Sequence, residues 1–273
     1  MGYPAGLHII ERAGTSSGTS SGTPTGTPTV VLVHGSLDRA ESFRRVIRRL
    51  PELTVVAYDR RGYQGSRAGG VVGLGGHVAD LLGILAEVRA RGAAPVVAVG
   101  HSVGGDVVLG AALAERGACD AVGAFEPPMP WLGFRRPQPD GGSRQGGRAP
   151  ATDDPGEEAE RFFRRMVSPS AWERLSEAGR EGRRADGPAL LADFRSLRDG
   201  PPFDVLDLAV PALFGMGGRA SAAHHRDAVA WLGAHVPGAA VYEIAGAHHG
   251  AHLSHPDNFA GFVRAVLERA PEA

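Results

Sequence analysis

The stretch Pro95-Val96-Val97-Ala98-Val99-Gly100-His101-Ser102-Val103-Gly104-Gly105 decides the fold of this chain. Its first half is a β-branched run that predicts a buried strand, and the following residues, 106–116, have a helical pattern. Between them lies a G-x-S-x-G sequence, which in this context holds a serine on a sharp, strained turn between strand and helix. We therefore predict that Ser102 is a nucleophile. The alternative is an ordinary glycine-rich turn, because the chain contains 40 glycines.

The rest of the chain alternates between strand and helix patterns. We expect strands at 7–10, 29–33, 53–58, 95–99, 121–125, 212–216 and 240–244, and helices at 40–50, 78–89, 106–116, 222–236 and 257–269. This alternation predicts an α/β fold with a doubly wound, mostly parallel sheet. We expect two loops: residues 14–28, which have low complexity, and residues 134–154, which are rich in Gly, Pro and Arg.

The alternation stops between residues 126 and 211, where residues 155–197 have a helical pattern without strands. We expect 1–126 and 208–273 to form the two parts of an α/β core, and 127–207 to form a helical cap. We expect this insertion to lie over the carboxyl edge of the sheet, where open α/β sheets bind their ligands.

Composition excludes several classes of function. The 29 basic and 30 acidic residues nearly cancel, so we expect a small-molecule substrate and neither a nucleic-acid nor a membrane partner. The chain has no lysine, which excludes Schiff-base chemistry, and its single cysteine, Cys119, excludes a disulfide framework. Without a leader-type N-terminal segment or a long apolar run, the chain is expected to be cytoplasmic. The sequence leaves the oligomeric state open.

Four motifs together carry a family resemblance: Val31-Leu32-Val33-His34-Gly35-Ser36, the run from Tyr58 to Ser66, the Ser102 turn, and Gly246-Ala247-His248-His249 followed by His255-Pro256. In this order the chain resembles the α/β-hydrolase superfamily over nearly its whole length. The resemblance implies a serine hydrolase that forms an acyl-enzyme and needs no metal or organic cofactor.

The resemblance also implies the base and the acid. His249 takes the position of the family's catalytic histidine, between the last strand and the closing helix, with His252 as the alternative. The family's usual acid position follows strand 212–216, where residues 217–221 contain no carboxylate. Glu126, at the end of the preceding strand, is therefore the candidate acid; in the alternative, Glu126 pairs with Arg219 and leaves only a dyad.

Two backbone N–H groups are expected to form an oxyanion hole. Val103 would supply one, and Ser36, or the adjacent Leu37, would supply the other. The predicted substrate pocket consists of the residues beside these motifs and in the start of the cap, namely Leu37, His101, Met129, Trp131 and His252. Trp131 has the alternative role of anchoring the cap to the core.

We expect no metal site. His249 and His252 have a plausible ligand spacing, but no carboxylate or cysteine accompanies them in the sequence. The leading hypothesis is hydrolysis of a small to medium, largely apolar ester, thioester or lactone. The alternatives are a non-hydrolytic enzyme of a biosynthetic pathway on the same fold (a lyase, cyclase or perhydrolase) and a non-catalytic ligand-binding protein.

Overall fold

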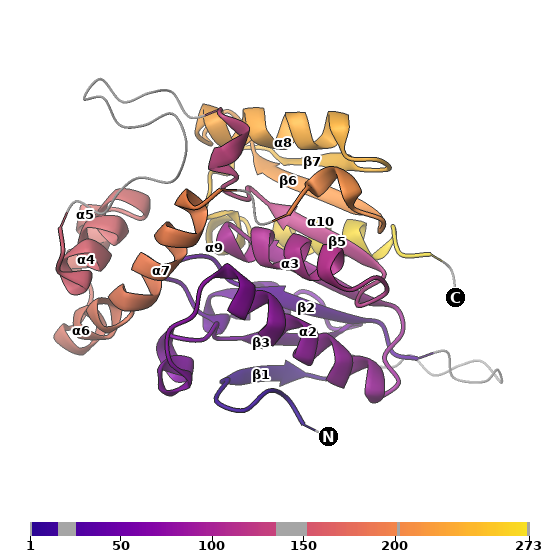
Figure 1. Ribbon diagram of the computed structural model, residues 1–273, viewed down its shortest axis with the longest axis horizontal. Helices are drawn as coiled ribbons and strands as arrows, with labels where there is room; N and C mark the ends of the chain where they lie inside the picture. The colour runs from indigo at the N-terminus through magenta and orange to yellow at the C-terminus, as the bar shows by residue number, and fades with distance from the viewer. Residues whose placement is uncertain (1, 16–25, 135–151, 201–202, 272–273) are drawn as a thin grey trace.

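The computed structural model describes residues 2–15, 26–134, 152–200 and 203–271, and within them the chain forms a seven-stranded sheet flanked by helices (Figure 1). The strands are β1 (Ile9–Arg12), β2 (Thr29–Val33), β3 (Thr54–Tyr58), β4 (Val96–His101), β5 (Ala121–Phe125), β6 (Ala212–Gly217) and β7 (Ala240–Ile244). Their order is β1-β3-β2-β4-β5-β6-β7, and β1 alone pairs antiparallel with its neighbour. The predicted α/β class and mostly parallel sheet are confirmed.

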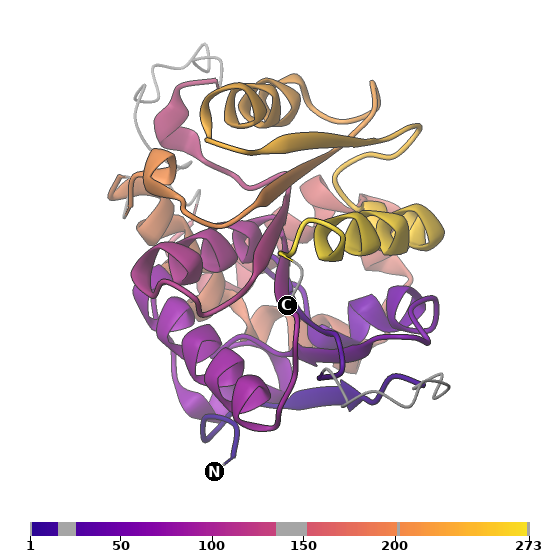
Figure 2. The same ribbon diagram turned by 90° about the vertical axis from the view of Figure 1, so that its right-hand side faces the viewer.

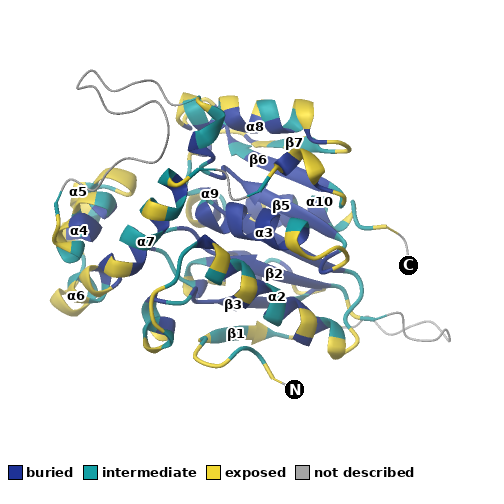
Figure 3. Cartoon of the chain, viewed as in Figure 1, coloured by how far each residue is buried: buried dark blue, intermediate teal, exposed yellow. Residues whose placement is uncertain are grey.

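Both faces of the sheet are covered because its central strands are apolar on both sides. Alternate residues point to opposite faces of a strand. Val31 and Val33 of β2 therefore pack under helices α2 (Leu74–Ala90) and α3 (Val103–Ala114), while Val30 and Leu32 pack under α1 (Arg44–Ile47) and α10 (Pro256–Leu267). Figure 2 shows α2 and α3, in violet and magenta, on one side of the sheet and α10, in yellow, on the other. The buried strands stand out in Figure 3.

The helices that flank the sheet are α1 (Arg44–Ile47), α2 (Leu74–Ala90), α3 (Val103–Ala114), α8 (Ala223–His235), α9 (Ala251–Ser254) and α10 (Pro256–Leu267). The helix expected at 40–50 is shorter than predicted: a 3₁₀ turn, η1 (Ala40–Phe43), precedes α1. This turn begins where the Ala40 N–H donates to Asp59 Oδ1 at 2.8 Å, an anchor that periodicity does not reveal. None of the helices in the described ranges is long and apolar enough to cross a membrane.

Between β5 and β6 the chain forms a short turn, η3 (Pro130–Leu132), then α4 (Pro155–Met166), α5 (Pro169–Glu173), α6 (Glu177–Ala185) and α7 (Gly187–Arg198), and a further turn, η4 (Val205–Asp207). We call residues 155–198 the helical insertion. Its apolar side chains, Ala159, Phe163, Trp172 and Leu190, form a cluster that also contains Leu37 from the loop after β2. The insertion therefore packs against the carboxyl end of the sheet (Figure 1). The domain bounds remain a prediction, and residues 16–25 and 135–151 of the two expected loops lie outside the described residues.

Candidate active site

Three neighbouring strands end at one edge of the sheet and bring the predicted site residues together. Val33 of β2 pairs with Gly100 of β4, and His101 of β4 pairs with Phe125 of β5. The residues that directly follow these strands, namely His34, Ser102 and Glu126, therefore emerge side by side. This is the edge at which open α/β sheets place their ligands.

Backbone strain is concentrated at this edge. Non-glycine residues rarely adopt a positive φ, yet Leu37, Ser102 and Glu126 have φ values of 54°, 54° and 47°. The Ser102 turn is held in place because its N–H donates to the Phe125 carbonyl at 2.9 Å and its carbonyl accepts from the Gly105 N–H at 2.7 Å. Residues kept in strained conformations cluster at functional sites. The side chain of Ser102 is partly exposed at the start of α3.

Glycines flank Ser102 because the backbone passes too close for a side chain. A Cβ atom at Gly104 would lie 2.1 Å from the Val33 carbonyl oxygen, and one at Gly100 would lie 2.0 Å from the Gly104 carbonyl oxygen. Gly35 is close to the serine itself, since a Cβ there would be 2.8 Å from Ser102 Cβ. The glycines of the motif thus permit the contact between β2, β4 and α3.

We expect Gly104→Ala to lower the free energy of unfolding by about 3 kcal/mol, because the added methyl group has to push the start of α3 away from the backbone at the end of β2. Gly75→Ala is the matched control, since a Cβ at that helical position meets nothing within 4 Å, and alanine there should be neutral or stabilising. Urea denaturation of both variants measures the difference. Equal stability of the two variants would contradict this account of the turn.

His249, whose side chain is 19% exposed, pairs with Glu126 at this edge of the sheet. His249 Nδ1 lies 2.7 Å from Glu126 Oε2, and Glu126 is fully buried. The second carboxylate oxygen accepts from the Gly217 N–H at 2.8 Å and from the Ser221 hydroxyl. Burial raises the pKa of Glu126, but the hydrogen bonds from His249, Ser221 and Gly217 outweigh it and hold the pKa below its usual value. Glu126 is therefore ionised at neutral pH and keeps the His249 proton on Nδ1.

Two other histidines fix the His249 ring. His225 of α8 stacks on it nearly in parallel, with centroids 4.6 Å apart at 15°, and the His101 ring lies 4.8 Å away. His101 Nε2 lies 2.7 Å from the His249 carbonyl oxygen. Among the described residues no hydrogen bond joins Ser102 to His249. Catalytic hydrogen bonds are often long or poorly aligned before substrate binds, so this does not exclude the two as partners.

The backbone N–H groups of Ser36 and Val103, the predicted oxyanion donors, donate no hydrogen bond to any described residue. They follow β2 and Ser102, at the edge where the serine emerges. The Ser36 hydroxyl donates to Asp193 Oδ2 at 2.6 Å, and the Leu37 carbonyl accepts from Arg183 at 2.5 Å. Both partners belong to the helical insertion, which therefore holds the 34–37 loop.

A buried ion pair strengthens this connection. Arg60 and Asp193 form two hydrogen bonds, of 3.0 and 2.8 Å, and both side chains are at most 1% exposed. Arg60 Nε also donates to the His34 carbonyl at 3.0 Å, and the Tyr63 hydroxyl donates to Asp193 at 2.6 Å. Burial would raise the pKa of Asp193, but the Arg60 guanidinium outweighs it and holds that pKa far below its usual value.

The predicted pocket residues do not all line one pocket. Leu37 packs into the apolar cluster of the insertion, while Met129 belongs to the core beside α3 and also lines a small cavity near His225. Trp131 packs edge-on against Phe203, with ring centroids 6.3 Å apart, and both side chains pack against the core cluster that contains Met129. His101 and His252 are buried beside His249 rather than on an open wall.

Sequence reasoning missed three residues that support the site: Asp38, Asp193 and Ser221. Asp38 is two residues beyond Ser36, and its carboxylate lies 3.1 Å from His252 Nε2. The sequence does indicate that Asp193 is buried, because it lies on the same helix face as the apolar residues Leu190 and Leu197. The sequence gives no signal for Ser221, since a serine in a glycine-rich loop is unremarkable.

Two groups of side chains have the donor atoms for a metal ion: Glu126 with His225 and His249, and Asp38 with His101 and His252.

Comparisons with known proteins agree with this architecture. Solved structures with the same fold include a hydrolase from Pseudomonas aeruginosa PA01 (TM-score 0.66, 17% identity, 96% of this chain and 94% of that chain). Another is the carboxylesterase CesB from Bacillus subtilis (TM-score 0.64, 16% identity, 96% of this chain and 87% of that chain). A third is the enol-lactonase from Burkholderia xenovorans LB400 (TM-score 0.63, 19% identity, 96% of this chain and 96% of that chain). No curated protein matches the sequence. The model of the alpha/beta hydrolase family matches residues 30–262, and the chain belongs to this family.

Proposed function

We propose that the protein is a serine hydrolase that cleaves a small to medium, largely apolar ester, thioester or lactone through an acyl-enzyme. The observation that carries the proposal is that a strained serine, Ser102, and Glu126, which is hydrogen-bonded to His249, follow neighbouring strands at the same edge of the sheet. The esterase and lactonase among the structural neighbours share the fold, and they support this class of reaction.

In the proposed mechanism Ser102 Oγ attacks the acyl carbon and its proton passes to His249 Nε2. The N–H groups of Ser36 and Val103 hold the oxyanion of the tetrahedral intermediate. The alcohol or thiol then leaves with the proton from His249. A water molecule attacks the acyl carbon in the second half, and its proton returns through His249 to Ser102 Oγ. Glu126 stays ionised and stabilises the imidazolium form of His249.

We expect Glu126→Gln to lower kcat by about 10⁴-fold, because a neutral amide no longer fixes the tautomer of His249 or stabilises its charged form. The substitution keeps the size of the side chain. Glu268→Gln makes the same change at an exposed glutamate, so it is the control and should be fully active. A Glu126→Gln enzyme within about tenfold of wild-type kcat would rule out Glu126 as the acid of the triad.

The function is tested with a panel of p-nitrophenyl esters, acyl thioesters and lactones, combined with mass spectrometry of rapidly quenched reactions. We expect turnover of at least one class, together with an adduct on Ser102 whose mass equals the acyl group. Turnover without any acyl adduct, even with slow substrates, would favour direct attack by water. Conversion of a substrate without net hydrolysis would favour the lyase or cyclase alternative.

A further inference from the structure

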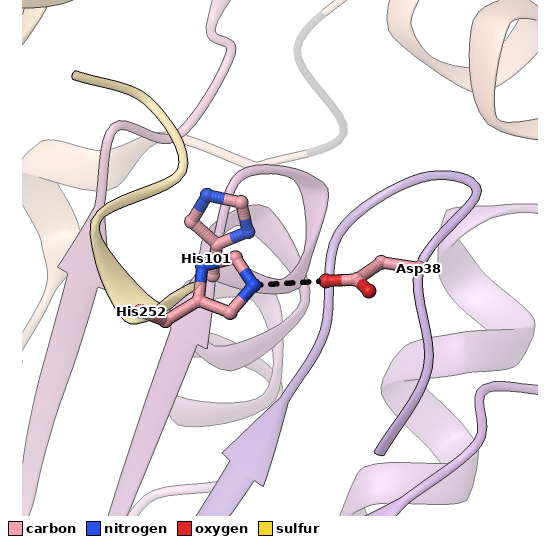
Figure 4. Close-up of side chains that lie close together, drawn as sticks. All are labelled: Asp38, His101 and His252. Atoms are coloured by element: carbon pink, nitrogen blue, oxygen red, sulfur yellow. Dashed lines mark hydrogen bonds and ion pairs between the residues drawn. The ribbon is translucent and has the colours of Figure 1, made fainter. Parts of the chain in front are cut away.

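A second cluster of donor atoms lies next to the proposed triad and is not needed for acyl transfer. The rings of His101 and His252 are tilted at 46° to each other with centroids 4.2 Å apart, and Asp38 approaches them from the loop after β2 (Figure 4). One donor atom from each of the three residues lies within 4.8 Å of the other two. The three come from positions far apart in the chain, and the fold alone brings them together. We infer that Asp38, His101 and His252 form a binding site for a transition-metal dication such as Zn²⁺.

The hydrogen bonds of His101 prepare it as a ligand. Its Nε2 lies 2.7 Å from the His249 carbonyl oxygen, which can only accept, so Nε2 carries the proton. The other nitrogen, Nδ1, is buried, has no hydrogen-bond partner among the described residues, and faces the side of the ring on which Asp38 lies (Figure 4). A metal-binding histidine commonly donates its second N–H to a carbonyl or carboxylate in this way.

His252 and Asp38 supply the other two ligands. Their atoms Nε2 and Oδ2 are 3.1 Å apart, close to the ~3.4 Å that separates two ligands of a tetrahedral zinc ion. Asp38 Oδ2 also accepts from the Ser42 hydroxyl at 3.1 Å, whereas Oδ1 accepts from none of the described residues. The side chain of His252 is 2% exposed and that of Asp38 is 17% exposed, so an ion would be reached from the Asp38 side.

The chemistry of these donors selects the class of ion. Two imidazoles and one carboxylate suit zinc and its neighbours in the first transition series, whereas Mg²⁺ and Ca²⁺ prefer oxygen ligands alone. The proton that His252 Nε2 now shares with Asp38 would move to His252 Nδ1, which is buried and accepts no hydrogen bond within the described part of the chain.

Occupation of this site is expected to inhibit the hydrolase. His101 directly precedes Ser102, and its hydrogen bond reaches the backbone of His249. A dication on His101 would oppose formation of the imidazolium on His249, which the proposed mechanism requires. Inhibition therefore rests on the proposed function, but binding of the ion does not.

Binding is measured first, without any substrate, from the visible absorption of the Co²⁺-loaded protein and by elemental analysis after gel filtration with Zn²⁺. We expect one ion per wild-type chain, and a loss of affinity of about 100-fold in Asp38→Asn and in His252→Gln. His248→Gln, which changes an exposed histidine of the same loop, is the matched control and should bind normally. Circular dichroism establishes that each variant is folded.

Three results would overturn the inference: no ion on the wild-type chain, undiminished binding by folded Asp38→Asn and His252→Gln, or loss in His249→Gln with binding retained in His252→Gln. The last would place the ion at the Glu126, His225 and His249 group instead. A wild-type crystal soaked in Zn²⁺ gives an answer that depends on no variant, because its anomalous signal should lie between Asp38, His101 and His252. Inhibition reversed by a chelator is then expected for wild type and not for Asp38→Asn, provided that the hydrolase activity is established.

Discussion

Replacing Ser102 by alanine is expected to reduce kcat for ester or thioester hydrolysis by about 10⁶-fold, the largest effect of any single substitution in this protein. The variant retains the N–H groups of Ser36 and Val103 and the His249–Glu126 pair, but it has no atom that can form the acyl-enzyme. The residual rate would come from attack by water assisted by these groups. Substrate binding should be nearly unchanged, since the lost hydroxyl group is small.

The control for this substitution is Ser170→Ala, at an exposed position of the helical insertion whose hydroxyl bonds only to Ser168 among the described residues. It should retain wild-type kcat. Initial rates with the best ester of the panel, at saturating concentration, measure both variants. A Ser102→Ala enzyme with more than about a hundredth of wild-type kcat would show that the serine is not the nucleophile.

Replacing Asp193 by asparagine is expected to lower the free energy of unfolding by about 3–5 kcal/mol. The substitution leaves the buried Arg60 guanidinium without its anion, and it weakens the acceptor of the Ser36 and Tyr63 hydroxyls. Because Asp193 also connects the helical insertion to the loop that carries Ser36, we expect kcat/KM to fall even where the variant is folded. Asp227→Asn, at an exposed site, is the control and should match wild type in both measurements.

Acid denaturation gives an independent test of the same ion pair. The pKa of Asp193 is held far below its unfolded value of about 3.9, so the stability that it contributes is fully present above that pH and is lost as the pH falls below it. The unfolding free energy of wild type should therefore fall more steeply between about pH 4 and pH 2 than that of Asp193→Asn. Parallel curves for the two proteins would contradict a stabilising Arg60–Asp193 pair.

The sheet was largely predictable because its signal is local. Buried parallel strands are continuous apolar runs, and the runs at 29–33, 121–125 and 240–244 match β2, β5 and β7 as observed. The helix expected at 40–50 shows the limit of such reasoning. Its residues have helical periodicity, but the bond from the Ala40 N–H to Asp59 imposes a 3₁₀ turn first.

The site was predictable where chain order and strand ends define it, and not where distant side chains meet. Glu126 is a candidate from the sequence because residues 217–221 contain no carboxylate and Glu126 ends the preceding strand, and in the structure its carboxylate lies against His249 rather than Arg219. The contact between Asp38 and His252 joins residues 214 positions apart. The sequence predicts no metal site because no carboxylate lies close to His252 along the chain. In the folded chain Asp38 lies next to His252.

The most direct test of the central claim, an activated Ser102, is the intact mass of the protein after treatment with a fluorophosphonate. Ser102 Oγ attacks phosphorus and fluoride leaves, so wild type should gain the mass of one phosphonyl group per chain, and Ser102→Ala should gain none. Absence of an adduct on folded wild type would contradict the account. So would equal labelling of the two proteins, because another residue would then be the reactive nucleophile.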